Sequence, residues 1–374
     1  KFEAIMPRKD KSDRAARLGA LLASKNLLIR REAAEALGHF PFTNPEIPKL
    51  IRNYLHSSCW ETRIAASEAL QSVLKSIPTS SRDVVPSITM LSSLDLFTTV
   101  RDFYPLLSCE SELVMRVGNA TSFGEQRKLV DEQLDMQLAT GISSQSFITE
   151  EDFGSTAETA SEQKLRLDTS ALSIQEEETA DETDGVIRSF CYDMLVDLAN
   201  AKWEIRHGGG LGLAILLKSA RSSFSPSLID VVSTRLFQTL ALDTFIDFAS
   251  GRSAVGPVRE SIAECIAALI VAFPYQNYLD LILKHLRALC SMNEDMWAKM
   301  GFDHNAEARK HLWLQRQAAV LVLKYHLAGP LFYLRFDEFY DIISLSFEDS
   351  HDEAGFFICL DRNNCIILQE KFIG

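Results

Sequence analysis

The residues with the most obvious chemical potential follow Trp203. His207 is succeeded at once by Gly208, Gly209 and Gly210. Clustered glycines at a helix start can let backbone N–H groups hold a phosphate, and histidine is the commonest general base. No Lys-Ser/Thr pair follows these glycines, however, and no predicted strand precedes them. No known motif places a Ser or Cys nucleophile beside the histidine. We therefore expect glycines that permit close helix contact and a partly buried, hydrogen-bonded histidine.

The other candidate ligands are the histidines and acids of the C-terminal third. His304, His311 and His326 lack the spacing of a zinc site. The acids are most simply a solvated helix end and loop: Asp341, Glu348, Asp349, Asp352 and Glu353. No nucleotide-binding loop with its partner residues is present. We predict no catalytic residue, no metal and no cofactor in this chain.

One pattern recurs along the chain, and it is built on arginine. A Trp stands three residues before an Arg three times: Trp60 and Arg63, Trp203 and Arg206, Trp313 and Arg316. Arg30 and Arg259 begin similar segments without the Trp. Each Arg is followed by a small or apolar residue at +3, another at +6, and Leu or Ile at +7.

This spacing indicates helices that pack closely. Positions +3 and +7 share one helix face, and small residues there let a neighbouring helix approach. The Arg falls in the first turn, where it can donate to loop carbonyls while its stem lies over the Trp. Units of about 40 residues, each a helix pair, predict an all-α fold: a HEAT-repeat α-solenoid.

Composition limits the classes of function. The chain has 374 residues, 47% hydrophobic content and a net charge of −13, which argues against a simple nucleic-acid binder. Residues 140–186 hold twelve acids but only Lys164 and Arg166, so most of the acidity is local. Seven Cys without a CxxC motif indicate reduced thiols. No apolar run is long enough for a membrane span, so we expect a cytosolic or nuclear protein without a membrane partner.

The spacing of the arginines also reveals an interruption, since Arg206 follows Arg63 by 143 residues. We predict N-terminal HEAT repeats over 1–78, an insertion over 79–185, and further HEAT repeats over 186–374. Within the insertion, 140–185 is rich in Ser, Thr and Glu, which predicts a disordered acidic linker. Near the C-terminus, Asn363-Asn364 could turn a hairpin, but the helical context favours a helix over 356–372.

Several segments together resemble one known family, the TATA-box-binding-protein-associated ATPases of the Swi/Snf type ("modifier of transcription one"). The resemblance is carried by residues 13–38, by Trp-Glu-Ile-Arg-His-Gly from Trp203, by Ala-Leu-Asp from Ala241 with Pro-Val-Arg-Glu from Pro257, and by a later repeat around Trp313. Leu314 and Gln315 depart from the family pattern. The resemblance covers most of the chain outside 78–185.

The resemblance implies a nuclear transcription regulator whose solenoid grips the TATA-box-binding protein (TBP). In that family a latch can occupy the DNA-binding face of TBP, and an ATPase domain uses ATP and Mg²⁺ to strip TBP from promoter DNA. We expect that domain to lie outside this sequence, so DNA is an indirect partner, and a second TBP regulator is a further suggested partner. A generic HEAT scaffold, such as a transport receptor or phosphatase subunit, is the alternative. By position the latch should occupy about 97–139, with these apolar candidates: Phe97, Val100, Phe103, Tyr104, Leu106, Leu107, Val114 and Met115.

Overall fold

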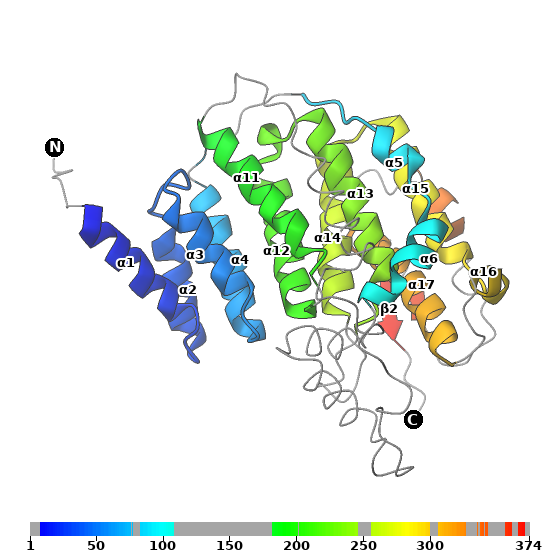
Figure 1. Ribbon diagram of the computed structural model, residues 1–374, viewed down its shortest axis with the longest axis horizontal. Helices are drawn as coiled ribbons and strands as arrows, with labels where there is room; N and C mark the ends of the chain where they lie inside the picture. Colours follow the sequence, from blue (N-terminus) through cyan, green and yellow to red (C-terminus); the bar gives the residue numbers. More distant parts are fainter. Residues whose placement is uncertain are drawn as a thin grey trace, which may run out of the picture.

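The structure is a computed structural model, and it shows helices standing side by side in one long row (Figure 1). It describes residues 8–75, 77, 83–107, 182–200, 202–245, 256–299, 306–326, 335, 337–339, 341–342, 356–360 and 366–370. The longer helices are α1 (Arg8–Leu21), α2 (Leu27–Leu37), α3 (Glu46–Leu55), α4 (Trp60–Leu74), α6 (Leu96–Leu107), α11 (Glu182–Asp197), α12 (Trp203–Ser219), α13 (Pro226–Leu242), α14 (Pro257–Ala272), α15 (Gln276–Ser291) and α17 (Ala306–His326). The short ones are α5 (Thr89–Ser93), η2 (Arg221–Ser223) and α16 (Glu294–Lys299).

The helices pack as successive pairs. α1 contacts α2, α3 contacts α4, α11 contacts α12, α13 contacts α14, and α15 contacts α17. The second helices of the pairs also stack on one another in the order α2, α4, α12, α14, α17. This is the HEAT-like α-solenoid that the arginine spacing predicts, and the second helices form its continuous layer.

Local sequence explains where the helices begin. The Asn26 side chain caps α2 by accepting a hydrogen bond of 2.9 Å from the backbone N–H of Leu28. Ser225 caps α13 in the same way, and Pro226 and Pro257 occupy the first turns of α13 and α14. Proline suits that position because its missing N–H would have no partner inside the helix.

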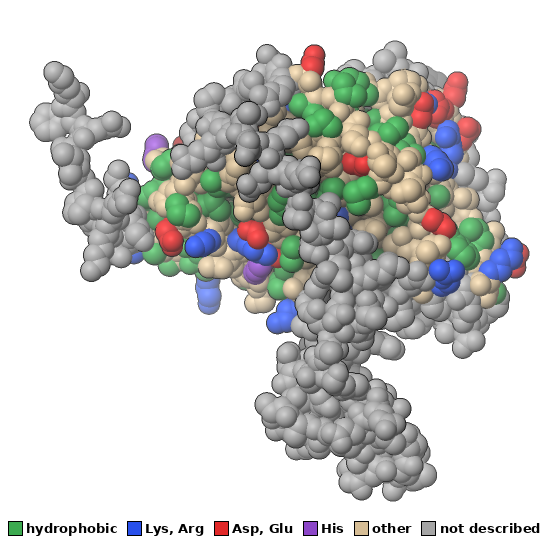
Figure 2. Space-filling view, turned by 45° about the horizontal axis from the view of Figure 1, so that its top comes forward, with side chains coloured by type: hydrophobic (Ala, Val, Ile, Leu, Met, Phe, Trp, Pro, Cys, Tyr) green, Lys and Arg blue, Asp and Glu red, His purple; other side chains and the backbone are tan. Residues whose placement is uncertain are grey.

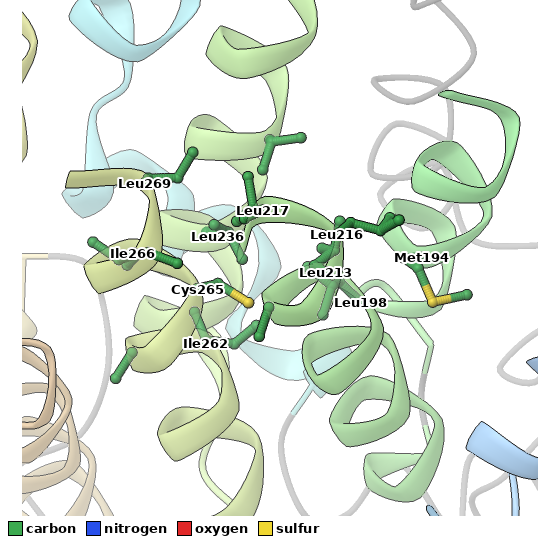
Figure 3. Packing of buried hydrophobic residues seen from close by; sticks show 14 of the residues in the cluster. Met194, Leu198, Leu213, Leu216, Leu217, Leu236, Ile262, Cys265, Ile266 and Leu269 are labelled. Carbon is green, nitrogen blue, oxygen red and sulfur yellow. The ribbon is translucent and has the colours of Figure 1, made fainter. Parts of the chain in front are cut away.

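The glycines of α12 are there for packing. A Cβ atom on Gly208 would lie 2.1 Å from the carbonyl oxygen of Leu55 in α3, and one on Gly210 would lie 2.2 Å from Oγ of Ser261 in α14. α12 therefore contacts both of its neighbours through bare backbone. The expectation that these glycines serve helix contact is confirmed. Figure 3 shows the apolar core that α11, α12, α13 and α14 share around Leu213 and Cys265.

The stack joins segments that are far apart in the sequence. α4 packs directly on α12, although residues 75–202 separate them. Within that interval, α5 and α6 cross to the other side of α11 and cover α13, with α6 also reaching α15 (Figure 1, cyan). Every residue of α13 from Leu228 to Leu242 is buried as a result, including the polar side chains of Asp230, Thr234 and Gln238. Residues 83–107, the first described part of the predicted insertion, thus pack on the stack through α5 and α6.

A buried carboxylate fixes this crossing. The Asp230 side chain in α13 accepts hydrogen bonds from the backbone N–H groups of Met90, at 2.8 Å, and Leu91, at 2.9 Å. His285 in α15 donates to the carbonyl oxygen of Leu91 over 2.9 Å. Two backbone N–H groups and one carbonyl group of α5 are therefore hydrogen-bonded by side chains of α13 and α15.

The C-terminal stretch corrects one prediction. Residues 356–372 were expected to form a helix, but β1 (Phe356–Leu360) and β2 (Ile366–Glu370) pair antiparallel, with Phe356 opposite Glu370 and Leu360 opposite Ile366. Aromatic and β-branched side chains favour the extended conformation over the helix. The acidic linker is described only from residue 182 onward, so its predicted disorder lies outside the described residues.

Candidate functional site

The arginines of the repeat lie in a row at one edge of the stack, and we call Arg30, Arg63, Arg206, Arg259 and Arg316 the arginine row. Arg30, Arg63, Arg206 and Arg259 each donate to a backbone carbonyl of the loop before their own helix, and Arg316 donates to a carbonyl that directly follows α15. The acceptors are Ser24 for Arg30, Ser57 for Arg63, Asn200 for Arg206, Asp243 and Phe245 for Arg259, and Met292 for Arg316. Carbonyl groups at a helix end have no hydrogen-bond donor inside the helix, so the arginine side chain donates to them instead. The expected contact with the preceding loop is confirmed for Arg30, Arg63, Arg206 and Arg259, whereas Arg316 lies in the middle of α17 and not in its first turn.

The same guanidinium groups connect neighbouring repeats. Nε of Arg63 donates to Nδ1 of His207 over 2.9 Å. Nε of Arg259 donates to Oε1 of Gln317 over 3.3 Å. His207 and Gln317 each stand one residue after the next arginine of the row, so a single position of the repeat accepts in both cases.

Asp243 is the acceptor that connects Arg206 and Arg259. Its Oδ1 atom lies 2.6 Å from Nη2 of Arg206, and its Oδ2 atom lies 3.1 Å from Nη1 of Arg259. The carboxylate is 0% exposed and the two arginine side chains 3% and 1%. A buried charge is tolerated only when it is paired and hydrogen-bonded, so the three side chains depend on one another.

Aromatic rings complete the row. The Arg63 guanidinium lies over the Trp203 ring, 4.8 Å from its centroid, and 5.6 Å from the centroid of Trp60. Its Nη2 atom is buried without a hydrogen-bond acceptor in the described residues, and the ring faces attract that charge instead. Trp203 in turn stacks on Phe245, with ring centroids 4.1 Å apart. The arginine thus lies over the Trp of the next repeat as well as its own.

His207 is held neutral in this environment. Its ring stacks on Trp60 with centroids 4.6 Å apart. Burial, and then the charge of Arg63, lower the pKa of His207 to about 3. A histidine with such a pKa is a weak base near neutral pH, and its Nδ1 atom is occupied by Arg63. The interpretation of His207 as a buried, satisfied residue is confirmed.

Two observations concern metal binding and the reactivity of the cysteines in the described residues. They contain no cluster of His, Cys, Asp or Glu that could hold a metal ion. Burial raises the pKa of the thiols of Cys191 and Cys265 above their ordinary range, which disfavours the nucleophilic thiolate. None of the described helices is long and apolar enough to cross a membrane.

What the edge does offer is apolar surface. Leu27, Leu28, Ile29 and Trp60 are exposed large side chains at the starts of α2 and α4, and we call them the apolar edge. Leu27 and Trp60 occupy the same repeat position, three residues before Arg30 and Arg63. Arg30 and Arg63 hydrogen-bond to the loops that precede these helix starts, so the backbone that carries the apolar edge is held in place. Neighbouring exposed apolar groups are typical of protein-binding surfaces.

The predicted latch residues divide into two groups. Val100 is 0% exposed and belongs to the core under α6, while Phe97 is partly buried against the same core. Val100 therefore serves the stack of this chain, and its assignment to a partner surface is wrong. The rest lie where no side chain is described, in α6 for Phe103, Tyr104, Leu106 and Leu107 and beyond it for Val114 and Met115. Trp313 lies in α17, likewise without a described side chain.

Sequence reasoning missed three residues on which the architecture depends. Asp243 and Gln317 accept from the arginine row, and Asp230 holds α5. Asp243 was visible only as part of a family-like segment. Gln317 shares its repeat position with His207, but no spacing marks Asp243 or Asp230, because their partners are distant in the sequence.

Paired helices and the arginine row define the class of this protein, a HEAT-like α-solenoid. Its relatives among curated proteins share one description. The chain is 24% identical over 362 residues to human TATA-binding protein-associated factor 172, covering 65% of this chain and 20% of that protein. It is 34% identical over 132 residues to TATA-binding protein-associated factor MOT1 of Saccharomyces cerevisiae, covering 30% of this chain and 7% of that protein.

A third relative is TATA-binding protein-associated factor mot1 of Schizosaccharomyces pombe, 24% identical over 160 residues, with 38% of this chain and 8% of that protein covered. No protein-family model matches the chain. The chain is thus homologous to part of these factors, as its Trp and Arg motifs indicated. It spans about a fifth of the human relative and less than a tenth of the two yeasts' relatives.

Proposed function

We propose that this chain is the TBP-binding solenoid of a nuclear transcription regulator that removes TBP from promoter DNA. The observation that carries the proposal is the homology to proteins named as TATA-binding protein-associated factors. The arginine row supports it, because the motifs that resemble the family are the ones that build the rigid edge of the stack. Hydrolysis of ATP with Mg²⁺ is assigned to a domain outside this sequence, so the chain itself binds and does not catalyse.

The apolar edge is our candidate for the grip on TBP. Leu27, Leu28 and Trp60 are held on helix starts that the arginine row immobilises, so binding costs little ordering of backbone. On the face of the stack that Figure 2 shows, acidic and basic side chains lie next to one another among apolar ones. A surface of that kind suits a folded protein partner better than the phosphate backbone of DNA.

The latch proposal changes with the structure. Because α6 is bound to α13, residues 97–107 are engaged within the stack, and the segment proposed to reach the DNA-binding face of TBP becomes 108–139. Val114 and Met115 stay in it, and the last turn of α6 adjoins it. Occupation of that face would make binding of the chain and binding of DNA to TBP mutually exclusive, with a second regulator competing for the same partner.

The test uses purified TBP and a labelled TATA-box duplex. The intact chain should bind TBP in a pull-down and lower the fraction of DNA shifted by TBP in a gel. A chain without 108–139 should still bind TBP but compete with DNA at least about tenfold less well. Absence of TBP binding by the intact, folded chain would favour the generic HEAT scaffold. Equal competition by the two chains would refute the latch placement alone.

A further inference from the structure

A groove of about 340 Å³ crosses the other end of the stack, away from the arginine row. It runs over the last turns of three successive second helices, with Leu217 from α12, Val271 from α14 and Tyr325 from α17. Arg206 and Arg259 lie in the first turns of α12 and α14, and Arg316 lies in the middle of α17. The groove is therefore a separate surface from the one proposed to bind TBP.

The floor of the groove is apolar and shallow because α14 carries small residues there. Ala267, Ala268 and Ala272 line it, where larger side chains would fill it. Val271 is 57% exposed at its wall, and Tyr325 is among the exposed large apolar side chains. Leaving a valine so exposed forfeits the free energy that its burial would give. A ligand that covers Val271 would recover it.

The rim of the groove carries a positive charge that no described acidic side chain neutralises. Lys218 and Glu264 pair with each other across α12 and α14. Arg221 in η2 also lines the groove and is exposed, and it forms no ion pair within the part of the chain that the structure describes. A ligand therefore meets one neutralised pair and one available guanidinium, which can bind a carboxylate through two parallel hydrogen bonds.

Tyr325, which also lines the groove, adds a hydrogen-bond donor. Burial, and then the charges of Glu260 and Glu264, raise the pKa of its phenol to about 12. The hydroxyl group keeps its proton at physiological pH and can donate to a carbonyl oxygen of a bound backbone.

We infer that this groove binds a short acidic peptide motif of a partner protein, in which a large aliphatic side chain covers the alanine floor beside Val271 and an adjacent carboxylate pairs with Arg221. The volume matches one or two side chains rather than a folded surface. An acidic motif fits better than a basic one, since the free charge of the rim is positive.

The probe for the test is a fluorescein-labelled peptide, Ser-Leu-Leu-Glu-Glu-Ser with blocked ends, titrated with the full chain and followed by fluorescence anisotropy at low salt. Arg221→Glu should weaken its binding at least tenfold, and Val271→Ser about threefold or more. Lys49→Glu is the matched control, because Lys49 is exposed on α3, which lies far from α14 and α17 in the row of helices. This variant should change binding less than twofold.

Two peptide controls separate the chemistry. Ser-Leu-Leu-Lys-Lys-Ser should bind at least tenfold more weakly, and so should Ser-Ala-Ala-Glu-Glu-Ser. Methyl NMR of alanine- and valine-labelled chain should show shifts at Ala268 and Val271 on addition of the acidic peptide. Equal affinity of the Arg221→Glu and wild-type chains, or shifts confined to other methyl groups, would overturn the inference while leaving the TBP proposal untouched.

Discussion

Nδ1 of His207 accepts a hydrogen bond of 2.9 Å from Nε of Arg63, although 144 residues separate them in the chain. The bond joins α4 to α12, the two second helices between which the sequence inserts the crossing segment and the acidic stretch. Ring stacking with Trp60 supports the same junction. His207 is thus one of the points at which the N-terminal repeats are attached to the rest of the stack, and the ion pair between Arg52 of α3 and Asp197 of α11 is another.

Replacing His207 should loosen that junction. His207→Ala removes the acceptor of a buried guanidinium donor and opens a cavity, so unfolding should become easier by about 2–4 kcal/mol. His207→Gln should recover part of the loss, because Gln317 accepts from Arg259 at the corresponding position. Urea unfolding followed by Trp fluorescence measures both, since Trp60 and Trp203 flank the site. Identical midpoints for the two variants would show that the hydrogen bond is unimportant.

The neutral state of His207 also predicts a pH dependence. Its pKa is about 3 in the folded chain and about 6.5 when unfolded. The unfolded chain therefore binds more protons between these values, and stability falls as the pH drops below about 6.5. Between pH 7 and pH 5 this group alone should cost about 2 kcal/mol. Unfolding of wild type and His207→Gln at both pH values isolates it. A wild-type loss no larger than that of the variant contradicts the assignment.

The sequence predicts what is local to each repeat. The Trp-Arg spacing and the small residues at +3 and +6 located the second helices and the loop contacts of most of the arginines, and the glycine cluster after His207 predicted close helix packing there. It could not predict which distant side chain each Nε atom finds, because His207 and Asp243 accept across repeats and long-range pairing leaves no periodic signal.

The misassigned residues have a common physical cause. Val100 is apolar and lies outside the repeat pattern, and composition alone cannot distinguish a side chain that binds a partner from one that packs on another helix of its own chain. The two apolar runs at 356–360 and 366–370 are short, and short apolar runs fit a buried helix or a strand equally well. Context favoured the helix, whereas β-branched residues such as Ile358, Ile366 and Ile367 favour the strand pairing.

Asp243 is expected to be the most sensitive charged residue. Asp243→Ala leaves Arg206 and Arg259 as buried charges without their carboxylate, which should cost about 3–5 kcal/mol. Glu264→Gln breaks a partly exposed pair with Lys218 and should cost less than about 1 kcal/mol. Chemical unfolding of the two variants gives the comparison. A similar small loss for both would mean that the buried triad contributes no more than a surface pair.

Two glycine-to-alanine substitutions, one in α12 and one in α11, should change stability in opposite directions. Gly208→Ala places a Cβ atom 2.1 Å from a backbone carbonyl, so helices must move apart and stability should fall by about 1–3 kcal/mol despite the better helix propensity of alanine. Gly185→Ala lies in α11, where nothing stands within 4 Å of the added atom, and should stabilise by up to about 1 kcal/mol. Thermal unfolding measures both. A stabilising Gly208→Ala would show that α12 is not in close contact with Leu55.

Val100 decides where the stack ends and the proposed latch begins. Its side chain is fully buried under α6, so Val100→Asp buries a carboxylate without a partner and should destabilise the chain by more than about 3 kcal/mol. Val85→Asp is the control, since Val85 is 61% exposed in the segment that leads to α5. Hydrogen exchange of the backbone amides of α13 tests the packing of α6 directly, because α5 and α6 cover this helix and protect its amides from exchange. If Val100→Asp leaves stability and α13 protection unchanged but weakens competition with DNA for TBP, then α6 belongs to the latch and not to the stack.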